Sequence, residues 1–483
     1  MDEGLLRYAV DQALSLGAKY AEARYQKDIH ESVILKNGVP EISARDLEEG
    51  VCVRVLLDGS LGFASTTVLN KRSIRSCVKS AISIAKASAK IRKKGITLSE
   101  EDLSKARVEV KPRIRFDAVD LDAKLDFLKE IDKSAVEVGR KMDVKIPTRL
   151  LEMLRWDCEK HLITSDGADI YTRVPRVMFE YFLTLHNPQR GVIQRFEHLG
   201  ESRGWEAIES WNLPERISNE VRSVSRVLLE GVAPPTEAVD VVLGPEITGI
   251  ACHESAGHPG EADRVLGREA AQGGESYIKP DLLGTKIGSD VVTVVDDSTI
   301  PNSFGYSPYD DEGVAGRERK LIENGYLREL LHNRETAAIF ETKSNGAARS
   351  AGYDYEPIIR MANTYMKPGD YSVEELIEDV KDGVYIKSYQ EWNIDDIRWN
   401  QRYVGVEAYR IIDGEIKEPV RNPVIELTTK SFFSSIDAVG KDLEFSAGYC
   451  GKGDPMQAVP VWFGGPSIRL RNIRLGSRGP QNF

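Results

Sequence analysis

The chain has 483 residues, 41% of them hydrophobic and 29% charged, which is typical of a folded globular protein and excludes a disordered, collagenous or low-complexity one. This length is enough for two or three domains. The 76 acidic residues outnumber the 65 basic ones, and the net charge of −11 argues against nonspecific binding to nucleic acid.

The cysteines and the first residues predict a cytoplasmic protein. The five cysteines are scattered, odd in number and without CxxC spacing, so they do not form a disulfide framework. The chain begins with acidic residues, unlike a secretory signal, and no run approaches the roughly 20 apolar residues that cross a bilayer. We therefore expect a reducing, cytoplasmic location without membrane attachment.

The N-terminal region combines helices with β-hairpins. Asn37-Gly38 and Asp58-Gly59 tolerate the positive φ angles of tight turns, and each pair predicts a hairpin. The flanking strands are expected at residues 30–36, 51–56 and 61–64. Apolar residues at helical spacing predict helices at residues 5–14, closed by Gly17, and at about 71–90 and 121–138.

The middle of the chain ends in a linker. From residue 150 to 200 the pattern is that of strands, with turns at 165–167 and 187–188. A helix over about 215–229 ends at Gly231 and is followed by Ala233-Pro234-Pro235-Thr236. We therefore predict an N-terminal α/β domain over residues 1–232 and a second domain over residues 233–483.

The second domain is expected to be richer in strands. Val239–Leu243 is a buried type of strand, and the proline of Gly244-Pro245 suits the first turn of a helix that carries residues 246–258. Further elements are predicted as strands at 291–295 and 460–470 and as a helix at 372–382 with Ser372 as its N-cap.

His253-Glu254-Ser255-Ala256-Gly257-His258 is the clearest candidate site. Imidazoles are good zinc ligands, and an adjacent carboxylate can take a proton from metal-bound water. On a regular helix, however, histidines five residues apart diverge by about 140°, and Glu254 with His258 could form an ordinary surface pair. Pro259 disfavours α conformation at His258, and a widened turn with i→i+5 bonding would bring the two rings together.

A catalytic zinc ion usually takes a third protein ligand and keeps an open position. Cys252 is poorly aimed, because it points about 100° away from His253 on a regular helix. Glu261 or Asp263 would add a carboxylate, and Cys450, in a glycine-flanked loop, would add a thiolate. The spacing alone does not choose among these three.

Further sequence blocks accompany the histidine motif along nearly the whole chain. They are 50–55, 62–64, 260–263 (GEAD), 310–313 (DDEG), 357–364 (PIIRMANT), 407–409 with 413–414, 450–452 (CGK) and 459–461 (VPV). These blocks resemble those of the TldD/PmbA family of metalloproteases. The HExxxH spacing is that family's own and resembles its TldD branch, because the PmbA branch generally lacks the metal motif. Pro259 and Cys52 stand where the family often has glycine.

The resemblance implies a site and a reaction. His253, His258 and Cys450 would bind one zinc ion per chain, and Glu254 would be the general base that activates water. The protein would then hydrolyse peptide bonds of small or unfolded peptides, with residues 233–483 as the catalytic metallopeptidase domain. The alternatives are a peptide-binding or scaffold subunit without catalysis and a zinc hydrolase of small amides.

The resemblance also implies an α+β fold in two domains, a mixed α/β N-terminal domain and a strand-rich, metal-binding C-terminal domain. It implies dimers that enclose the active site, formed with a like subunit or with a PmbA-type partner. The group that stabilises the oxyanion is not determined by the sequence. Its candidates, each with a structural role as the alternative, are Arg360, His332, Tyr306 and Tyr449.

Overall fold

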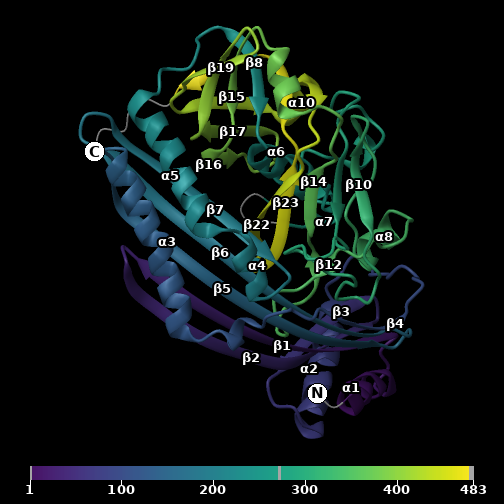
Figure 1. The fold of residues 1–483 in the computed structure, drawn as a ribbon. Coiled ribbons are helices and arrows are strands. Elements are labelled where there is room, and N and C mark those ends of the chain that lie inside the picture. The colour runs from purple at the N-terminus through teal and green to yellow at the C-terminus, as the bar shows by residue number, and fades with distance from the viewer. Residues whose placement is uncertain (1–2, 270–273, 478–483) are drawn as a thin grey trace.

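The computed structural model describes residues 3–269 and 274–477, and its fold is α+β, as predicted. Figure 1 shows a long, curved sheet from the N-terminal half with the smaller sheets of the C-terminal half above it. No helix within the described residues is long and apolar enough to cross a membrane.

The N-terminal sheet consists of long strands in the order β3-β2-β1-β5-β6-β4, with β7 also paired to β6. Its strands are β1 (Tyr20–Lys36), β2 (Val39–Leu57), β3 (Ser60–Thr66), β4 (Lys105–Glu109), β5 (Lys145–Thr164), β6 (Asp169–Asn187) and β7 (Gly191–Glu201). The predicted turns at Asn37-Gly38 and Asp58-Gly59 are present, and all four residues have positive φ.

Strand β1 begins ten residues before the predicted strand. The prediction missed this first part because the strand is buried on both faces there. Ala21, Ala23 and Tyr25 pack toward the helices, whereas the alternate residues Glu22 and Arg24 are buried against the second half of the chain. Because both faces of this segment are buried and one of them carries charged residues, the segment lacks the simple pattern of buried apolar and exposed polar residues from which a strand is predicted.

Helices cover the other face of this sheet. The described helices of this half are α1 (Glu3–Ser15), α2 (Lys71–Ala89), α3 (Leu121–Lys141), α4 (Trp205–Ser210), α5 (Leu213–Glu230) and the 3₁₀ turn η1 (Phe116–Ala118). In Figure 1, α3 and α5 lie side by side along the strands, where their apolar faces share a core with β5–β7. Helices α1 and α2 close the opposite end with a separate core.

The C-terminal half contains four further sheets among the described residues. Their strand orders are β19-β18-β15-β8-β24-β21, β11-β10-β9-β14-β23-β22, β16-β17-β20-β25 and β12-β13. The strands are β8 (Ala238–Leu243), β9 (Val294–Asp297), β10 (Glu318–Glu323), β11 (Tyr326–Leu327), β12 (Ala348–Arg349), β13 (Ile358–Ile359), β14 (Asn363–Met366), β15 (Asp382–Ile386), β16 (Tyr389–Ile394), β17 (Asn400–Gly405), β18 (Ala408–Ile412), β19 (Glu415–Pro419), β20 (Pro423–Thr428), β21 (Ile436–Val439), β22 (Glu444–Lys452), β23 (Gln457–Gly465), β24 (Ile468–Arg474) and β25 (Gly476–Ser477).

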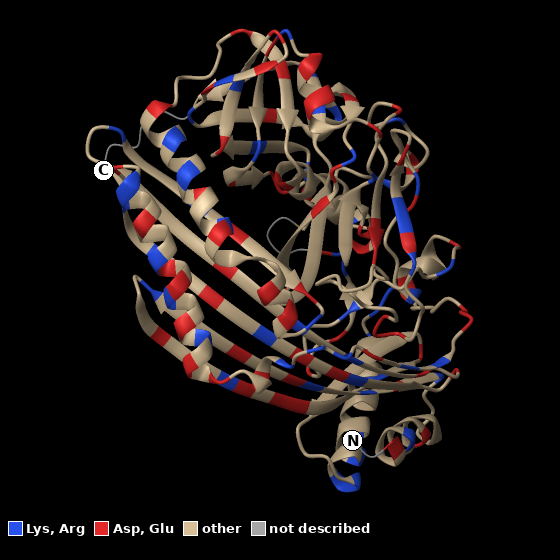
Figure 2. Cartoon of the chain, in the orientation of Figure 1, with Lys and Arg blue, Asp and Glu red and all other residues tan. Residues whose placement is uncertain are grey.

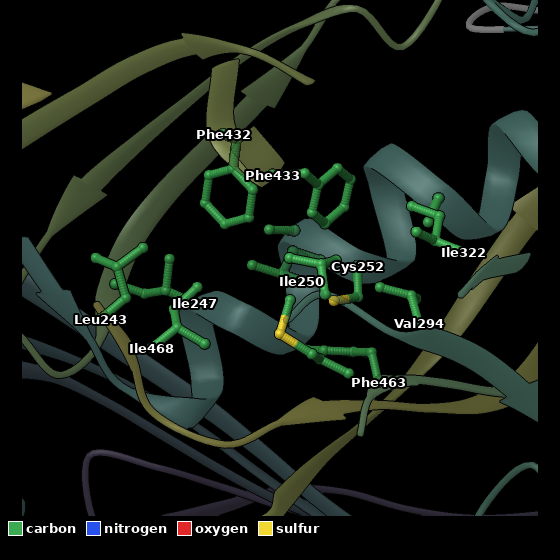
Figure 3. Packing of buried hydrophobic residues seen from close by; sticks show 14 of the residues in the cluster. Leu243, Ile247, Ile250, Cys252, Val294, Ile322, Phe432, Phe433, Phe463 and Ile468 are labelled. Carbon is green, nitrogen blue, oxygen red and sulfur yellow. The ribbon is translucent and has the colours of Figure 1, made fainter. Parts of the chain in front are cut away.

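A central helix, α6, lies between these sheets. Most of its side chains are apolar and buried, as expected of a helix in a core. Figure 3 shows Ile250 and Cys252 of α6 packed near Phe432 and Phe433, with Phe463 on the far side. The helices and turns of this half are α6 (Pro245–Cys252), α7 (Ala262–Val265), α8 (Arg334–Ile339), α9 (Val373–Glu378), α10 (Thr429–Ser435), η2 (His253–Gly257), η3 (His258–Gly260) and η4 (Pro280–Leu282).

The helix predicted to carry residues 246–258 is α-helical only to Cys252, and two further predicted elements of this half differ from the observed ones. Val291 and Val292 precede β9 instead of starting it, because the Val292 N–H bonds back to the Ser289 carbonyl in a turn. The predicted helix at 372–382 is confirmed only as α9, with Ser372 in a reciprocal capping box. It ends early because the chain turns at Val380 to enter β15.

The predicted boundary at 232/233 falls between the end of α5 and the start of β8. The largest cores on either side of it are separate clusters. As a domain boundary, the position stays a prediction.

Buried ion pairs join the two halves. Figure 2 shows acidic and basic residues along the strands of the N-terminal sheet. On the face toward the C-terminal half, the Arg54 guanidinium pairs with Glu22 at 2.9 Å and with Glu312 at 2.7 Å, and the Lys160 ammonium pairs with Asp311 at 2.8 Å. The DDEG block at 310–313 therefore serves the contact between the halves.

Candidate metal centre

The histidine motif lies where helix α6 changes its winding. The helix is regular to Cys252, and residues 253–257 then form one π turn, in which the His258 N–H donates to the His253 carbonyl. This is the widened i→i+5 turn considered from the sequence. The two imidazole rings face each other nearly at right angles, with their centroids 5.0 Å apart.

Gly257 allows the widened turn to pack closely. A Cβ atom at this position would lie 2.0 Å from the Met361 sulfur, so with a larger residue either the Met361 side chain or the turn would have to shift. Pro259 is the second residue of the 3₁₀ turn η3 and has no N–H with which to continue the helix.

Cys450 comes to the histidines from β22, far along the chain. Its Sγ atom is 3.3 Å from the His258 Nε2 atom, and both side chains are buried. One ligand atom from each of His253, His258 and Cys450 lies within 4.8 Å of the others. Ligand atoms around a tetrahedral zinc ion are about 3.3–3.6 Å apart, given bonds of about 2.0–2.3 Å. The three residues are thus brought together with nearly the spacing of a metal site.

The protonation states suit a cation. Burial lowers the pKa of His253 and of His258, which favours the neutral rings that bind metals. Burial alone would raise the pKa of the Cys450 thiol, but His258 and Arg360 outweigh it and lower that pKa to about 7. The Nδ1 atom of His253 is buried without a hydrogen-bond partner among the described residues. Buried polar atoms usually have a partner, so this nitrogen suits a site that binds a metal ion.

Glu261, an alternative ligand in the sequence, contacts the opposite side of the His258 ring. Its carboxylate accepts from the His258 Nδ1 atom at 3.1 Å and from the Arg264 Nε atom at 2.6 Å. Burial would raise the pKa of Glu261, but Lys452 and Arg264 hold it well below the usual range. An anionic carboxylate on the outer ring nitrogen fixes the ring with Nε2 directed at Cys450.

Asp263, the other alternative, is engaged with a buried cation. The Lys452 ammonium donates to its two carboxylate oxygens at 2.7 and 2.8 Å. The same ammonium donates to the Ile359 carbonyl at 2.9 Å. Lys452 follows Cys450 on β22, so this contact also holds the end of that strand in place.

Three of the four candidates for oxyanion stabilisation do not line the cavity beside the two histidines. Arg360 is fully buried and donates to the carbonyls of Cys450 and Gln457, so it supports the β22–β23 hairpin. His332 is hydrogen-bonded to Thr336, and Tyr306 lines a different cavity. Of the four candidates, Tyr449 lines the cavity beside the histidines.

This cavity has a volume of ≈ 300 Å³ and lies between the two halves of the chain. His253, Glu254, His258 and Cys450 all contribute to its wall. Aromatic rings make up much of the remainder, from Phe196 of the N-terminal sheet and from Tyr389, Trp392, Tyr449 and Phe463. The metal candidates and the predicted base therefore share one space.

Arg398 is a member of this site that the sequence did not indicate. Its guanidinium pairs with the Glu254 carboxylate inside the cavity. The two residues are 144 positions apart. Arg398 belongs to none of the sequence blocks, and no local pattern points to it.

Comparison with known proteins gives matches along most of the chain. Three family models match: PmbA/TldA metallopeptidase domain 1 over residues 21–85, the central domain over 114–229 and the C-terminal domain over 236–477. A metalloprotease of Methanocaldococcus jannaschii is 31% identical over 95% of this chain and 97% of its own length. The zinc metalloprotease TldD homolog of Saccharolobus solfataricus is 28% identical over 97% of this chain and 98% of its own.

Solved structures share the fold. A Thermotoga maritima protein, described as a candidate modulator of a DNA gyrase, has a TM-score of 0.78 at 20% identity, over 99% of this chain and all (100%) of its own. TldE from Thermococcus kodakarensis has a TM-score of 0.74 at 18% identity, over 98% of this chain and 99% of its own.

Proposed function

The chain belongs to the PmbA/TldD family of metallopeptidases, and we propose that it is a zinc-dependent peptidase with Glu254 as general base. The observation that carries this proposal is the buried cluster of His253, His258 and Cys450, which shares a cavity with Glu254. A zinc ion held there, one per chain, would supply a Lewis acid and water of lowered pKa.

The chain's own residues account for the remaining chemistry. The Glu254 carboxylate would take the proton of the attacking water and pass it to the amine that leaves the cleaved peptide bond. Glu261 would hold the His258 ring in position. The thiolate of Cys450 adds negative charge to the ligand set, so we expect a weaker Lewis acid, and slower turnover, than three neutral histidines would give.

The shape of the cavity supports small or unfolded peptides as substrates. Its volume of ≈ 300 Å³ admits a short stretch of chain, and both halves of the protein enclose it. Its aromatic wall suits apolar side chains. A stable folded protein cut as fast as its unfolded form would contradict this choice of substrate.

We also propose that the protein works in the cytoplasm as a dimer, with a like subunit or with a PmbA-type partner. Light scattering of the purified chain, alone and mixed with such a partner, tests the dimer. A monomer under both conditions would contradict it.

Metal analysis combined with a random peptide library tests the proposed function. We expect one zinc ion per chain and cleavage of library peptides by the wild type, loss of both in His253→Ala, and loss of cleavage alone in Glu254→Gln. Full activity in zinc-loaded Glu254→Gln would overturn the assignment of the base. A wild type that holds zinc and cleaves only small amides, or one that binds peptides without cleaving them, would favour the alternative functions.

A further inference from the structure

One cationic side chain lines the cavity of the candidate site. Of the described Lys and Arg residues, only Arg398 contributes to the cavity wall, and its guanidinium contacts the Glu254 carboxylate. The side chain is 11% exposed. The positive charge of Arg398 is therefore largely shielded from water and lies against Glu254, the group that we assign as the base.

The backbone around Arg398 is held in an uncommon conformation. Arg398 lies in the turn between β16 and β17 with a φ of 63°, in the left-handed region that residues with side chains rarely adopt. Its N–H donates to the Asp395 carbonyl at 3.0 Å, and its carbonyl accepts from the Thr429 hydroxyl at 2.9 Å. Such conformations persist where surrounding contacts enforce them, and they gather at functional sites.

The next residue anchors the same turn. The Trp399 N–H donates to the Asp395 carboxylate at 2.7 Å, and its ring lies 5.2 Å from that of Tyr277. The turn is therefore fixed on both sides of Arg398, and its side chain is directed into the cavity.

The place of Arg398 relative to Glu254 limits what it can contact. A general base must lie within hydrogen-bond distance of the water that it deprotonates, and that water adjoins the carbonyl carbon under attack. A guanidinium in contact with the base is therefore within reach of the carbonyl oxygen as well. Negative charge develops on this oxygen during attack, and a fixed donor stabilises it most strongly in a site shielded from water.

We propose that Arg398 is a catalytic residue that donates a hydrogen bond to the oxygen of the scissile carbonyl as negative charge develops there. The inference rests on the proposed peptidase function. In the reaction, a bond forms between the water oxygen and the carbonyl carbon and the C–N bond breaks, while the proton of the water passes through Glu254 to the leaving amine. Arg398 remains protonated throughout, because guanidinium does not lose its proton in proteins.

Steady-state kinetics with a matched control test the proposal. The variants are Arg398→Ala, Arg398→Lys and, as control, Arg402→Ala, whose guanidinium pairs with Glu391 and Glu426 away from this cavity. In Arg398→Ala we expect kcat to fall by about 10²–10³-fold, the loss typical of one oxyanion donor, with little change in KM. Arg398→Lys should be intermediate, and added guanidinium ion should partly restore Arg398→Ala. Arg402→Ala should match the wild type.

A binding measurement provides a readout besides activity. A phosphinic peptide carries a tetrahedral, anionic group where the substrate has its scissile amide. We expect its affinity for zinc-loaded Arg398→Ala to fall by about the same factor as kcat/KM, while an uncleaved peptide of the same sequence binds unchanged. Zinc content and circular dichroism equal to those of the wild type confirm that the variant is folded and loaded.

Each contrary result is distinct. Unchanged kcat in Arg398→Ala would overturn the role of Arg398, as would an equal loss of affinity for both peptides. If Arg398→Ala slows cleavage only of substrates with a free C-terminal carboxylate, and not of the same peptides with a C-terminal amide, Arg398 binds that carboxylate. This result would also overturn the proposed role. A zinc-loaded wild type without peptidase activity would instead contradict the proposed function.

Discussion

Cys450 is the residue whose contacts the sequence could least specify and on which the candidate metal centre most depends. Its Sγ atom lies 3.3 Å from the His258 Nε2 atom, on the side of the ring opposite Glu261. The buried thiol is poised to ionise near neutral pH, with a pKa lowered to about 7. The residues that surround it therefore favour an anionic sulfur beside the two histidine rings.

Replacing this sulfur should weaken zinc binding. In Cys450→Ser, a hydroxyl that does not ionise replaces a thiolate, so we expect zinc affinity to fall at least about 10-fold. The measurement is zinc content after dialysis against a graded chelator. Cys252→Ser is the matched control, since Cys252 is also buried and adjoins His253 but packs in the apolar core. Zinc retention in Cys450→Ser equal to that of the control would exclude Cys450 as a ligand.

Zinc affinity should also depend on pH. Zinc binds the thiolate, and the pKa of Cys450 is about 7, so protons compete with the metal below that value. We expect the apparent affinity to be nearly constant from pH 8 to about 9 and to weaken about tenfold per pH unit below about pH 6.5. Competition titrations with a chelator of known pH dependence measure this. A flat profile between pH 5.5 and 8 would contradict a titrating thiol ligand.

At the scale of the element, one widened turn brings together the two histidines of the candidate site. Regular winding would separate the rings of His253 and His258 by about 140°. The π turn over residues 253–257 brings their centroids within 5.0 Å of each other. The hairpin of β22 and β23 then brings Cys450 to the same place, because α6 packs directly on both strands.

Gly257→Ala should disturb this turn. The new Cβ would meet the sulfur of Met361, whose side chain is fully buried. We expect a loss of about 1–3 kcal/mol in the free energy of unfolding, the usual cost of overpacking, together with reduced zinc content. Met361→Ala in the same chain should relieve the contact and restore part of the zinc content. Denaturant unfolding and metal analysis are the measurements, and a Gly257→Ala variant with wild-type values in both would show that the turn adapts.

At the scale of the whole molecule, the candidate site depends on how the two halves sit against each other. Phe196 of β7 and residues of the C-terminal half form the same cavity. The Trp462 indole N–H donates to the Gly200 carbonyl at 2.6 Å, and β22 packs on β7. The ion pairs of Arg54 and Lys160 hold the far end of this contact.

Breaking one of these buried pairs should destabilise the protein strongly. Arg54→Ala leaves Glu22 and Glu312 buried without their cation, and loss of one partner from a buried pair typically costs about 3–5 kcal/mol. Arg226→Ala, which removes a half-exposed pair with Glu230, is the control, for which we expect a change of about 0–1 kcal/mol. Chemical denaturation measures both. Equal stabilities of the two variants would show that the buried pairs contribute no more than surface ones.

Much of this protein follows from its sequence alone. Hairpins at Asn37-Gly38 and Asp58-Gly59 and the long helices follow from local patterns, because turn chemistry and helical periodicity act over a few residues. The family follows from motifs spread along the chain, and the α+β class follows from the resemblance to that family. The HExxxH motif makes a metal site a candidate, because its histidines and glutamate are chemically suited to one, although its spacing on a regular helix separates the two rings. The family resemblance, and not the spacing, gave Cys450 as the third ligand.

Only the tertiary structure placed Arg398 against Glu254 and turned Glu261 and Asp263 away from the shared space of the histidines. The tertiary structure also decided that residues 253–257 form a π turn, and that the charged residues Glu22 and Arg24 of β1 are buried against the second half of the chain. Contacts between residues 144 or 192 positions apart leave no periodic trace in the sequence. They arise when sheets and helices pack, since packing decides which distant side chains share one desolvated space.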